Sequence, residues 1–361
     1  MKPVPKHRPS LSDVAKAAGV SLATTSRALN DQAEVAPETA RRVRLAAAQL
    51  GYAPNRVAQQ LRSKRTGVLG LIVASLGNPA YEPYVGGAVQ AAGQLGYTTF
   101  VCDAEYNDDL YRLHLRRLLE HQVDGLIISE RIHAPDLLEP FLSRGLPIEP
   151  DPRESVTEFG FSRQVATRQV LDEAYGELVE LGHRNVAYLK VARPGAPRRI
   201  GSEERIRALI ETYASVDGGL AEVWDVPGGQ SAVEDFVFRA LSKPNRPTAV
   251  VVSSMALEGF LRAVERLPLQ IPRDLSALCV GEVPWARFCS PPLSTIGADS
   301  YELGARAARR IVAVITGDDA SSNANPAPPF RYVRRGSVGP ARISSRKSRK
   351  AEQPMAALPG E

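Results

Sequence analysis

The chain is poor in the residues and runs that mark several large classes of protein. It has 3 cysteines in 361 residues. Cys102, Cys279 and Cys289 lie far apart without a C-x-x-C pair, so they support neither a disulfide framework nor a zinc site, and we expect buried free thiols. No run of about twenty apolar residues occurs, and the opening Met-Lys-Pro-Val-Pro-Lys-His-Arg does not lead into the apolar segment of a secretory signal. A cytoplasmic protein without a membrane span is therefore expected.

Catalytic patterns are equally scarce. The sequence contains no G-x-S-x-G, no Walker loop and no metal-spaced cluster of His and Cys. Gly86-Gly87 lies within a helical pattern and lacks phosphate-loop spacing. His183 follows the Leu181-Gly182 helix stop, where we expect a side chain that caps the helix rather than a catalytic base. We expect no enzymatic activity, no cofactor and no metal.

The charges are strongly segregated along the chain. With 43% hydrophobic and 24% charged residues, it has the composition of a soluble globular protein with room for about two or three domains. Residues 1–66 carry 12 Lys/Arg against 4 Asp/Glu, residues 67–330 carry 25 against 34, and residues 331–350 carry 8 against none. The basic head has the electrostatic character of a phosphate-binding surface, whereas DNA would repel the acidic body.

Residues 11–30 have the pattern of two short amphipathic helices separated by a Gly19-Val20-Ser21 turn. Gly19 can adopt a positive φ without steric cost, and Ser21 is a natural N-cap for the second helix. The apolar face at helical spacing consists of Val14, Ala15, Ala18, Val20, Thr25, Ala28 and Leu29. The outward face of the second helix carries polar groups that can bond phosphates or base edges. The pattern is typical of a helix-turn-helix DNA reader, although an ordinary helical hairpin fits these residues alone.

A third helix is predicted from Ala36-Pro37-Glu38-Thr39, because a proline in the first turn and an acidic residue near the positive end both favour a helix start. Gly51 ends it, and Tyr52-Ala53-Pro54 makes a stiff exit. The octet 55–62 that follows has good helix formers and an N-cap in Asn55, but two helical turns are not stable alone. It must order against a partner, for which a second copy of itself and a DNA groove are the candidates.

Together these segments resemble the lactose-repressor-like (LacI/GalR) family of bacterial transcriptional regulators, from Leu11 to about Ser337. The matching pieces are Asp13-Val-Ala-Lys-Ala-Ala-Gly-Val-Ser, Thr25-Ser-Arg-Ala-Leu-Asn, Leu50-Gly-Tyr-x-Pro-Asn-Arg-Val-Ala-Gln-Gln-Leu, Leu71-Ile-Val with Asn78-Pro79, Val123-Asp-Gly-Leu-Ile-Ile, Leu181-Gly-His-Arg and Pro291-Pro-Leu-Ser-Thr-Ile. Each piece alone is weak, but the set in this order and spacing is specific. The resemblance implies a sequence-specific repressor that acts in the cytoplasm at the nucleoid and binds a palindromic operator in double-stranded DNA as a homodimer.

The resemblance also implies how the head meets DNA, with the second helix in the major groove. The head residues that it places on DNA are Leu11, Ser21, Leu22, Ala23, Thr24, Ser26, Arg27, Asn30 and Tyr52. Base edges would be faced by Leu22, Ala23, Ser26 and Arg27, and the backbone by Ser21, Thr24 and Asn30. Arg27 is the best candidate for a hydrogen-bonded base contact. Leu22 and Ala23 can contact a thymine methyl or exclude a base but cannot hydrogen-bond one, so we expect an unusual operator.

By the same resemblance, the octet is a hinge helix that pairs with its twin in the minor groove. Leu61 would wedge into a central base step, and Asn55, Ala58 and Gln59 would contact the groove or the backbone. Such a wedge kinks the duplex and costs a few kcal/mol of unstacking, which the contacts of the bent DNA offset.

From Gly67 onward, short apolar runs alternate with amphipathic helices, which predicts an α/β body. The predicted strands are Val68–Ala74, Thr98–Cys102, Leu126–Ser129, Val186–Lys190, Ala249–Val252 and Ala277–Val280. The predicted helices include Tyr84–Leu95, Asp109–His121, Thr167–Leu181, Ser231–Leu241 and Leu257–Arg266.

The resemblance, which extends to periplasmic sugar-binding proteins, implies a small all-α helix-turn-helix head joined by a hinge helix to a two-lobed α/β body. The expected segments are 1–53 for the head, 54–66 for the hinge helix and linker, 67–335 for the effector-binding and dimerisation body, and 338–361 for a disordered basic tail. Within the body, lobe 1 spans about 67–163 and 290–325, and lobe 2 about 164–289 and 326–337. A ligand between hinged lobes can favour one arrangement and thereby bias the hinge helices.

The effector residues expected between the lobes are Asn78, Tyr81, Arg153, Arg198, Ser253 and Glu282. Three acidic sites usual in the family are changed here: one falls at Ala166, one pair is replaced within Val252–Ser254, and another becomes Gly281-Glu282. Carboxylates are natural bidentate acceptors for sugar hydroxyls, so their loss favours a sugar derivative or an acidic metabolite, with arginines as counter-charges.

Two alternatives stay open. A body that serves only dimerisation would make the protein a ligand-independent repressor or architectural protein, with Arg198 a surface residue of the basic 193–199 loop. A cytoplasmic solute-binding protein with an incidental head is the other, and the charge of the head and the hinge octet oppose it. The tail after Ser337 lacks the leucine heptads of a tetramerising helix, so a dimer is expected.

Overall fold

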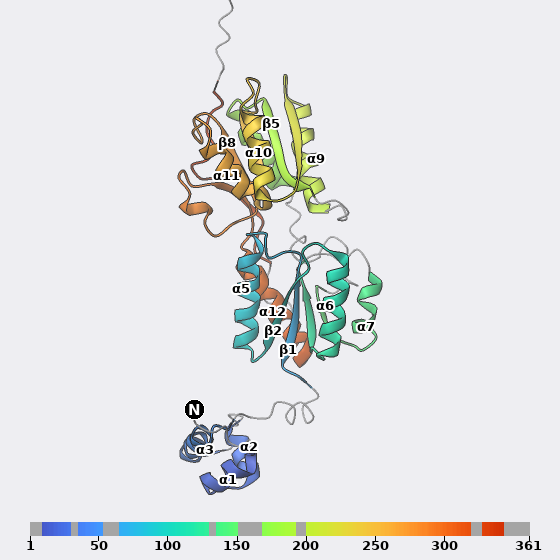
Figure 1. Cartoon of the computed structure of the whole chain (residues 1–361), viewed down its shortest axis with the longest axis vertical. Helices are drawn as coiled ribbons and strands as arrows, with labels where there is room; N and C mark the ends of the chain where they lie inside the picture. Colours follow the sequence, from blue (N-terminus) through green and yellow to red (C-terminus); the bar gives the residue numbers. More distant parts are fainter. Residues whose placement is uncertain are drawn as a thin grey trace, which may run out of the picture. The chain divides into compact units, whose positions relative to one another are not determined.

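The computed structural model describes residues 9–29, 35–52, 65–129, 135–150, 168–192, 200–318 and 327–342. The chain forms two compact units, Met1–Thr66 and Gly67–Glu361. Figure 1 shows the helical head and the α/β body.

The head consists of α1 (Leu11–Ala18), α2 (Leu22–Leu29) and α3 (Pro37–Leu50), as predicted. A capping box starts α1: the Asp13 backbone N–H donates to Ser10 Oγ at 3.3 Å, and the Ser10 N–H donates to the Asp13 carboxylate at 2.8 Å. Gly19 follows α1 with a φ of 63°, which allows the tight turn into α2. Small apolar residues from all three helices form one core, so the helices pack closely.

The first lobe contains a parallel sheet in the order β2-β1-β3-β4. Its strands are β1 (Val68–Val73), β2 (Thr98–Asp103), β3 (Gly125–Ile128) and β4 (Ile148–Glu149). The helices are α5 (Tyr81–Gln94), α6 (Asp108–Glu120), α7 (Glu139–Leu142) and α12 (Ser300–Thr316), with a 3₁₀ turn η1 (Pro135–Leu137). Helices α5 and α12 cover one face of the sheet, and α6 and α7 cover the other, which explains the uninterrupted apolar runs of β1 and β3.

Two glycines allow α5 and α12 to cross with their backbones in contact. A Cβ on Gly87 would lie 1.9 Å from the Tyr301 carbonyl oxygen, and a Cβ on Gly304 would lie 1.9 Å from the Tyr84 carbonyl oxygen. The Gly86-Gly87 pair therefore serves helix packing inside α5. This crossing fixes α12, which is distant in sequence, onto the first lobe.

The second lobe contains a sheet in the order β10-β9-β8-β7-β5-β6, parallel except for β10. Its strands are β5 (Asn185–Ala192), β6 (Leu220–Pro227), β7 (Ala249–Ser253), β8 (Ser276–Val280), β9 (Ser294–Gly297) and β10 (Arg331–Val333). Its helices are α8 (Arg168–Glu180), α9 (Ile200–Ala214), α10 (Gln230–Leu241) and α11 (Leu257–Glu265), with 3₁₀ turns η4 (Ser254–Ala256) and η5 (Ala286–Phe288). Helices α8 and α9 pack on one face, and α10 and α11 on the other.

All six predicted strands and all five named helices of the body are confirmed within a few residues of their expected ends. One expected boundary is wrong. Lobe 1 was expected to resume near residue 290, but β9 pairs in parallel with β8 and buries Ile296, so the chain leaves the second lobe only between Gly297 and Ser300. The expected crossing near 161–166 lies outside the described residues.

The described residues also bear on the membrane, metal and thiol expectations. No helix there is long and apolar enough to cross a membrane, and no group of three or more His, Cys, Asp or Glu side chains could hold a metal. The three thiols are free, but only Cys279 is buried, while Cys102 and Cys289 are half-buried. His183 does not cap α8 with its side chain. Its ring is buried between Thr248 Oγ1 and the Gly339 carbonyl oxygen, each 2.9 Å from a ring nitrogen.

Candidate nucleic-acid interface and interlobe site

The exposed face of α2 carries the side chains expected at base edges. Leu22 is 53% exposed, and Ala23 and Arg27 are exposed beside it. Thr25 and Ala28 point into the head core and are fully buried. The helix thus separates a packing face from an accessible face that is apolar at its start and cationic at its end.

The start of α2 is held by hydroxyl groups. Ser21 Oγ accepts the Thr24 backbone N–H at 3.0 Å and lies 2.8 Å from Thr24 Oγ1, which confirms the predicted N-cap. Thr25 Oγ1 donates to the Ser21 carbonyl at 2.9 Å. Because these hydroxyls fix the helix start, the neighbouring Leu22 and Ala23 are presented on a rigid turn.

The other expected DNA residues divide into two groups. Ser26, Leu11 and Tyr52 are half-buried, and Tyr52 packs against the head core. The remaining positions lie outside the described residues: Asn30, Asn55, Ala58, Gln59 and Leu61. The proposed effector arginines Arg153 and Arg198 also lie outside them.

In the body, Asn78 joins the two lobes. Asn78 follows β1, is 6% exposed, and its Oδ1 accepts the Ala80 N–H at 3.1 Å and the Ser254 hydroxyl at 2.9 Å. Ser254 belongs to η4, directly after β7 of the second lobe. Gly281, after β8, has a φ of 111°, and a Cβ there would meet the Ser254 Cβ at 3.0 Å. The carboxyl ends of β1, β7 and β8 therefore meet at one seam, where glycine is required.

Two other expected effector residues lie near this seam with different accessibility. Tyr81 is 2% exposed and packs in the core of the first lobe, so its ring does not face the seam. Ser253 ends β7, is half-buried, and its Oγ has no hydrogen-bond partner among the described residues. Of the two, Ser253 has hydrogen-bonding capacity left for a ligand.

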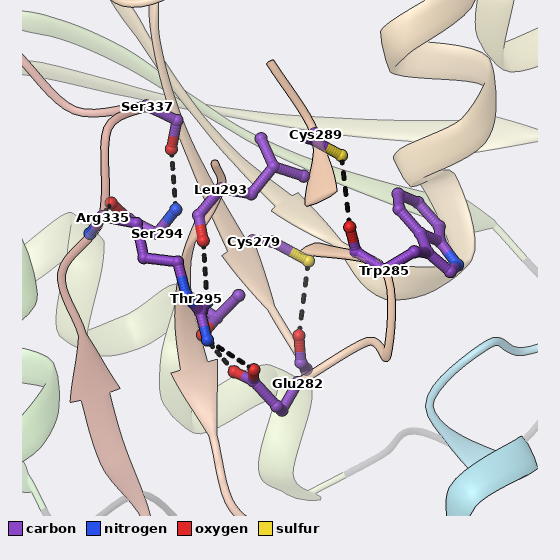
Figure 2. A network of polar contacts seen from close by, with 10 residues as sticks. Cys279, Glu282, Trp285, Cys289, Leu293, Ser294, Thr295, Arg335 and Ser337 are labelled. Atoms are coloured by element: carbon purple, nitrogen blue, oxygen red, sulfur yellow. Dashed lines mark hydrogen bonds and ion pairs between the residues drawn. The ribbon is translucent and has the colours of Figure 1, made fainter. Parts of the chain in front are cut away.

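The carboxylate of Glu282 is already bound by the chain itself (Figure 2). Arg335 Nη2 donates to Glu282 Oε1 at 2.6 Å, and Thr295 Oγ1 donates to the other carboxylate oxygen. Arg335 Nη1 also donates to the Leu293 carbonyl at 2.7 Å and to Thr295 Oγ1 at 2.9 Å. Glu282 is therefore neutralised by Arg335, a residue that the sequence did not indicate as its partner.

Two thiols flank this network and donate to backbone carbonyls. Cys279 Sγ lies 3.4 Å from the Gly281 oxygen, and Cys289 Sγ lies 3.6 Å from the Trp285 oxygen (Figure 2). Burial raises the pKa of Cys279 far above the usual thiol range, and the Glu282 charge adds to the effect. Burial also raises the pKa of Cys289, so both thiols remain protonated hydrogen-bond donors at neutral pH.

Arg205 is a candidate that the sequence reasoning missed. It lies on α9, its guanidinium carbon is 5.6 Å from the centre of the Phe330 ring, and its Nε is buried without a partner among the described residues. Burial raises the pKa of Tyr188, and the charge and hydrogen bond of Arg205 act against this rise. The signal available in the sequence was a basic residue in register with the apolar face of α9, three and four residues before Ala208 and Leu209.

A groove of about 430 Å³ lies between the loop after β1 and α11. Gly77 and Pro79 line one side, and Trp285 and the exposed turns of α11 line the other. None of the expected effector residues lines it.

A three-helix head with a helix-turn-helix and a two-lobed α/β body, combined in one chain, define a transcription regulator that binds DNA and carries a domain of the ligand-binding type. Family models match in three segments: "Bacterial regulatory proteins, lacI family" over residues 10–55, "Periplasmic binding proteins and sugar binding domain of LacI family" over 66–208, and "Periplasmic binding protein-like domain" over 175–338. The chain belongs to the lacI family of bacterial regulatory proteins.

Individual relatives agree with this assignment. The HTH-type transcriptional repressor PurR of Serratia proteamaculans is 30% identical over 308 residues, which cover 82% of this chain and 87% of the relative. The ribose operon repressor of Escherichia coli K12 is 28% identical, with 82% and 89% covered. Among solved structures, the lac repressor dimer bound to operator and the anti-inducer ONPF matches with a TM-score of 0.71 and 26% identity, covering 92% of this chain and all of that one.

Proposed function

We propose that this chain is a cytoplasmic, non-enzymatic repressor that binds a palindromic operator as a homodimer and changes its operator affinity when a small molecule binds between the lobes. The observation that carries the DNA part is the exposed face of α2, on which Leu22, Ala23 and Arg27 stand clear of the head core. The similarity to the lac repressor dimer bound to operator and the anti-inducer ONPF supports the same proposal.

Selection of bound sequences from a random DNA pool tests the operator claim. A dimer selects a palindrome whose half-sites report the α2 contacts. The Arg27→Ala variant should then lose about 1–3 kcal/mol of discrimination at one base pair of each half-site. Arg41→Ala, which removes an exposed arginine of α3, is the matched control and should keep that preference. A selected pool without dyad symmetry would contradict the proposal.

The effector claim rests on the seam between the lobes. Asn78 and Ser254 join the lobe edges, Gly281 allows their close approach, and the Ser253 hydroxyl has no hydrogen-bond partner among the described residues. Because Arg335 already binds the Glu282 carboxylate, Glu282 has less capacity left to accept hydrogen bonds from the hydroxyls of a neutral sugar. These features favour an acidic metabolite or a sugar acid over a neutral sugar.

The saturated Glu282 carboxylate also favours the second candidate function, a repressor that needs no ligand. A thermal-shift screen of sugars, sugar acids and phosphorylated metabolites separates the two candidates, since a ligand of the native state raises the melting temperature. Compounds that shift melting are then tested for their effect on operator affinity, with Ser253→Ala as the variant expected to weaken the response. If no compound changes either quantity, the ligand-independent function holds.

A further inference from the structure

The groove beside α11 is a candidate binding site apart from the seam. Its volume of about 430 Å³ falls within the range of about 300–1,000 Å³ that is typical of small-molecule sites. Gly77 and Pro79 line it from the first lobe, and α10, α11 and Trp285 line it from the second. The hydrogen-bonded seam residues Asn78 and Ser254 are not part of its lining. A ligand held there would contact both lobes without occupying the seam.

The second-lobe wall of the groove is fixed by one side-chain amide. Gln230, the first residue of α10, donates from Nε2 to the Met255 carbonyl at 2.7 Å, and its Oε1 accepts the Gly259 N–H at 2.9 Å. A Cβ on Gly259 would lie 2.5 Å from the Gln230 carbonyl oxygen, so α11 packs directly against the start of α10. Because both ends of the amide bind the chain, this wall is preformed.

The groove also offers apolar surface. Leu261 and Trp285 are half-buried and pack against the core of the second lobe, and Pro79 is half-buried opposite them. The Trp285 carbonyl accepts the Phe288 N–H at 2.9 Å, which holds the backbone at the start of η5. In Figure 2 the Trp285 ring lies apart from the Glu282 carboxylate. An indole face can stack on a flat ring and attract a cation.

The charged side chains of the groove leave one carboxylate without a counter-charge. Arg262 Nη2 donates to Glu258 Oε1 at 2.5 Å, so these two charges offset each other. Arg266, the next cation on α11, pairs instead with Glu234 of α10 at 2.7 Å. The exposed side chain of Glu265 has no ion pair or hydrogen bond with any described residue. The lining of the groove therefore carries a net negative charge beside an aromatic wall.

We propose that this groove binds an organic cation with a flat apolar body, of the aralkylamine class. Its ring stacks on Trp285, and its ammonium group pairs with Glu265. Such a cation gains from the ionic attraction and from the indole face, whereas a neutral molecule of the same shape gains only the stacking. An anion of that shape is repelled by Glu265. The site is additional to the interlobe effector site and does not depend on it.

Three probes of similar shape and different charge test this: phenethylamine, phenethyl alcohol and phenylpropionate. Each is titrated into the full-length protein at neutral pH in a calorimeter, where the amine is protonated as a lysine side chain is. The wild type should bind the amine more tightly than the alcohol by about twofold to fivefold, the effect of one exposed ion pair. The carboxylate should bind most weakly.

Fluorescence places the amine in the groove. The chain has 2 tryptophans, so Trp224→Phe leaves Trp285 as the single reporter. Its emission should change as the amine is added, with the same midpoint as the calorimetric titration.

Glu265→Gln should weaken the amine to the affinity of the alcohol and leave the alcohol unchanged. The matched control is Glu180→Gln, which removes an exposed carboxylate at the end of α8 and should keep the preference for the amine. Trp285→Leu should weaken the amine and the alcohol together, because both lose the stacking surface. Its urea unfolding is compared with the wild type first, and the comparison of Glu265→Gln with Glu180→Gln decides if Trp285→Leu is unstable.

The proposal is overturned if the wild type binds the alcohol or the carboxylate as tightly as the amine, or if Glu265→Gln keeps the preference as Glu180→Gln does. It is also overturned if the emission of Trp285 does not respond to the amine. A second copy of the chain seated on the groove is the competing occupant. It would make the emission of Trp285 depend on protein concentration and not on the amine, which overturns the proposal as well.

Discussion

Removal of the Arg335 guanidinium should lower the stability of the second lobe, and its hydrogen bonds allow the size of the loss to be estimated. In Arg335→Met, Glu282 loses an ionic hydrogen bond, and the Leu293 carbonyl and Thr295 hydroxyl lose their donor. Breaking a fully buried ion pair costs about 3–5 kcal/mol, but the Arg335 and Glu282 side chains are 18% and 31% exposed, so we expect a loss of about 2 kcal/mol.

The two partners should not be equivalent. Glu282→Gln keeps a carbonyl oxygen opposite Arg335, and Arg335 keeps its two other acceptors, so the expected loss is about 1 kcal/mol. In the double variant no carboxylate is left without its guanidinium. The free energy of unfolding lost by the double variant should therefore be about 1 kcal/mol smaller than the sum of the losses in the two single variants.

Tryptophan fluorescence during urea unfolding measures these losses selectively. The chain has 2 tryptophans, Trp224 on β6 and Trp285 beside the network, and both lie in the second lobe. Arg334→Met is the matched control, because Arg334 pairs with Glu177 while its own side chain is 63% exposed, and such surface pairs contribute about 0–1 kcal/mol. The reasoning is refuted if Arg335→Met and Arg334→Met unfold at the same urea concentration, or if the losses of Arg335→Met and Glu282→Gln simply add.

Three further expectations concern packing, capping and pH. Gly304→Ala places a Cβ 1.9 Å from the Tyr84 carbonyl oxygen and should lower the free energy of unfolding by about 2 kcal/mol in urea titrations. Gly93→Ala, with nothing within 4 Å of its Cβ, should raise the free energy of unfolding by about 0.5 kcal/mol. Equal stabilities of the two variants would contradict the backbone contact between α5 and α12. Ser21→Ala should cost the head about 1 kcal/mol through loss of the α2 cap, and Ser21→Asp should preserve it; calorimetry of the head transition decides. Burial lowers the pKa of His183 in the folded state. Neutral His183 therefore contributes stability above its unfolded-state pKa, and this contribution is lost as the pH falls through its folded-state pKa. The wild type should lose stability in that acidic range more steeply than His183→Gln, and parallel pH profiles of the two proteins would disprove this.

The elements that could be predicted are those whose signals are local. The β1 sequence Val-Leu-Gly-Leu-Ile-Val is buried on both faces and shows as a continuous apolar run. The turn at Gly19 and the cap at Ser21 depend on backbone geometry within a few residues. By contrast, β6 is an edge strand with exposed Glu222 and Asp225, so its pattern is too polar to predict a strand.

Partnerships across the chain could not be predicted in the same way. Tyr81 was expected at the effector site because it follows Asn78-Pro79, but it begins α5 and packs inward among the apolar residues of the first lobe. Glu282 was identified as a candidate, yet its partner Arg335 stands on the returning segment beyond α12. No local spacing relates these two residues, because the fold alone brings them together.

The segment from the end of β9 to the start of α12 runs from the second lobe into the first and passes the seam. A Cβ on Gly297 would lie 2.6 Å from the Glu282 backbone nitrogen, so the end of β9 packs directly beneath the Glu282 loop. Three residues later α12 begins, capped by Asp299, whose side chain accepts the Glu302 N–H at 3.0 Å. Since α12 is fixed against α5 by backbone contact at Gly87 and Gly304, it cannot move without α5. The Glu282 loop, the end of β9 and the α5–α12 pair therefore form one continuous run of packed contacts from the second lobe into the first.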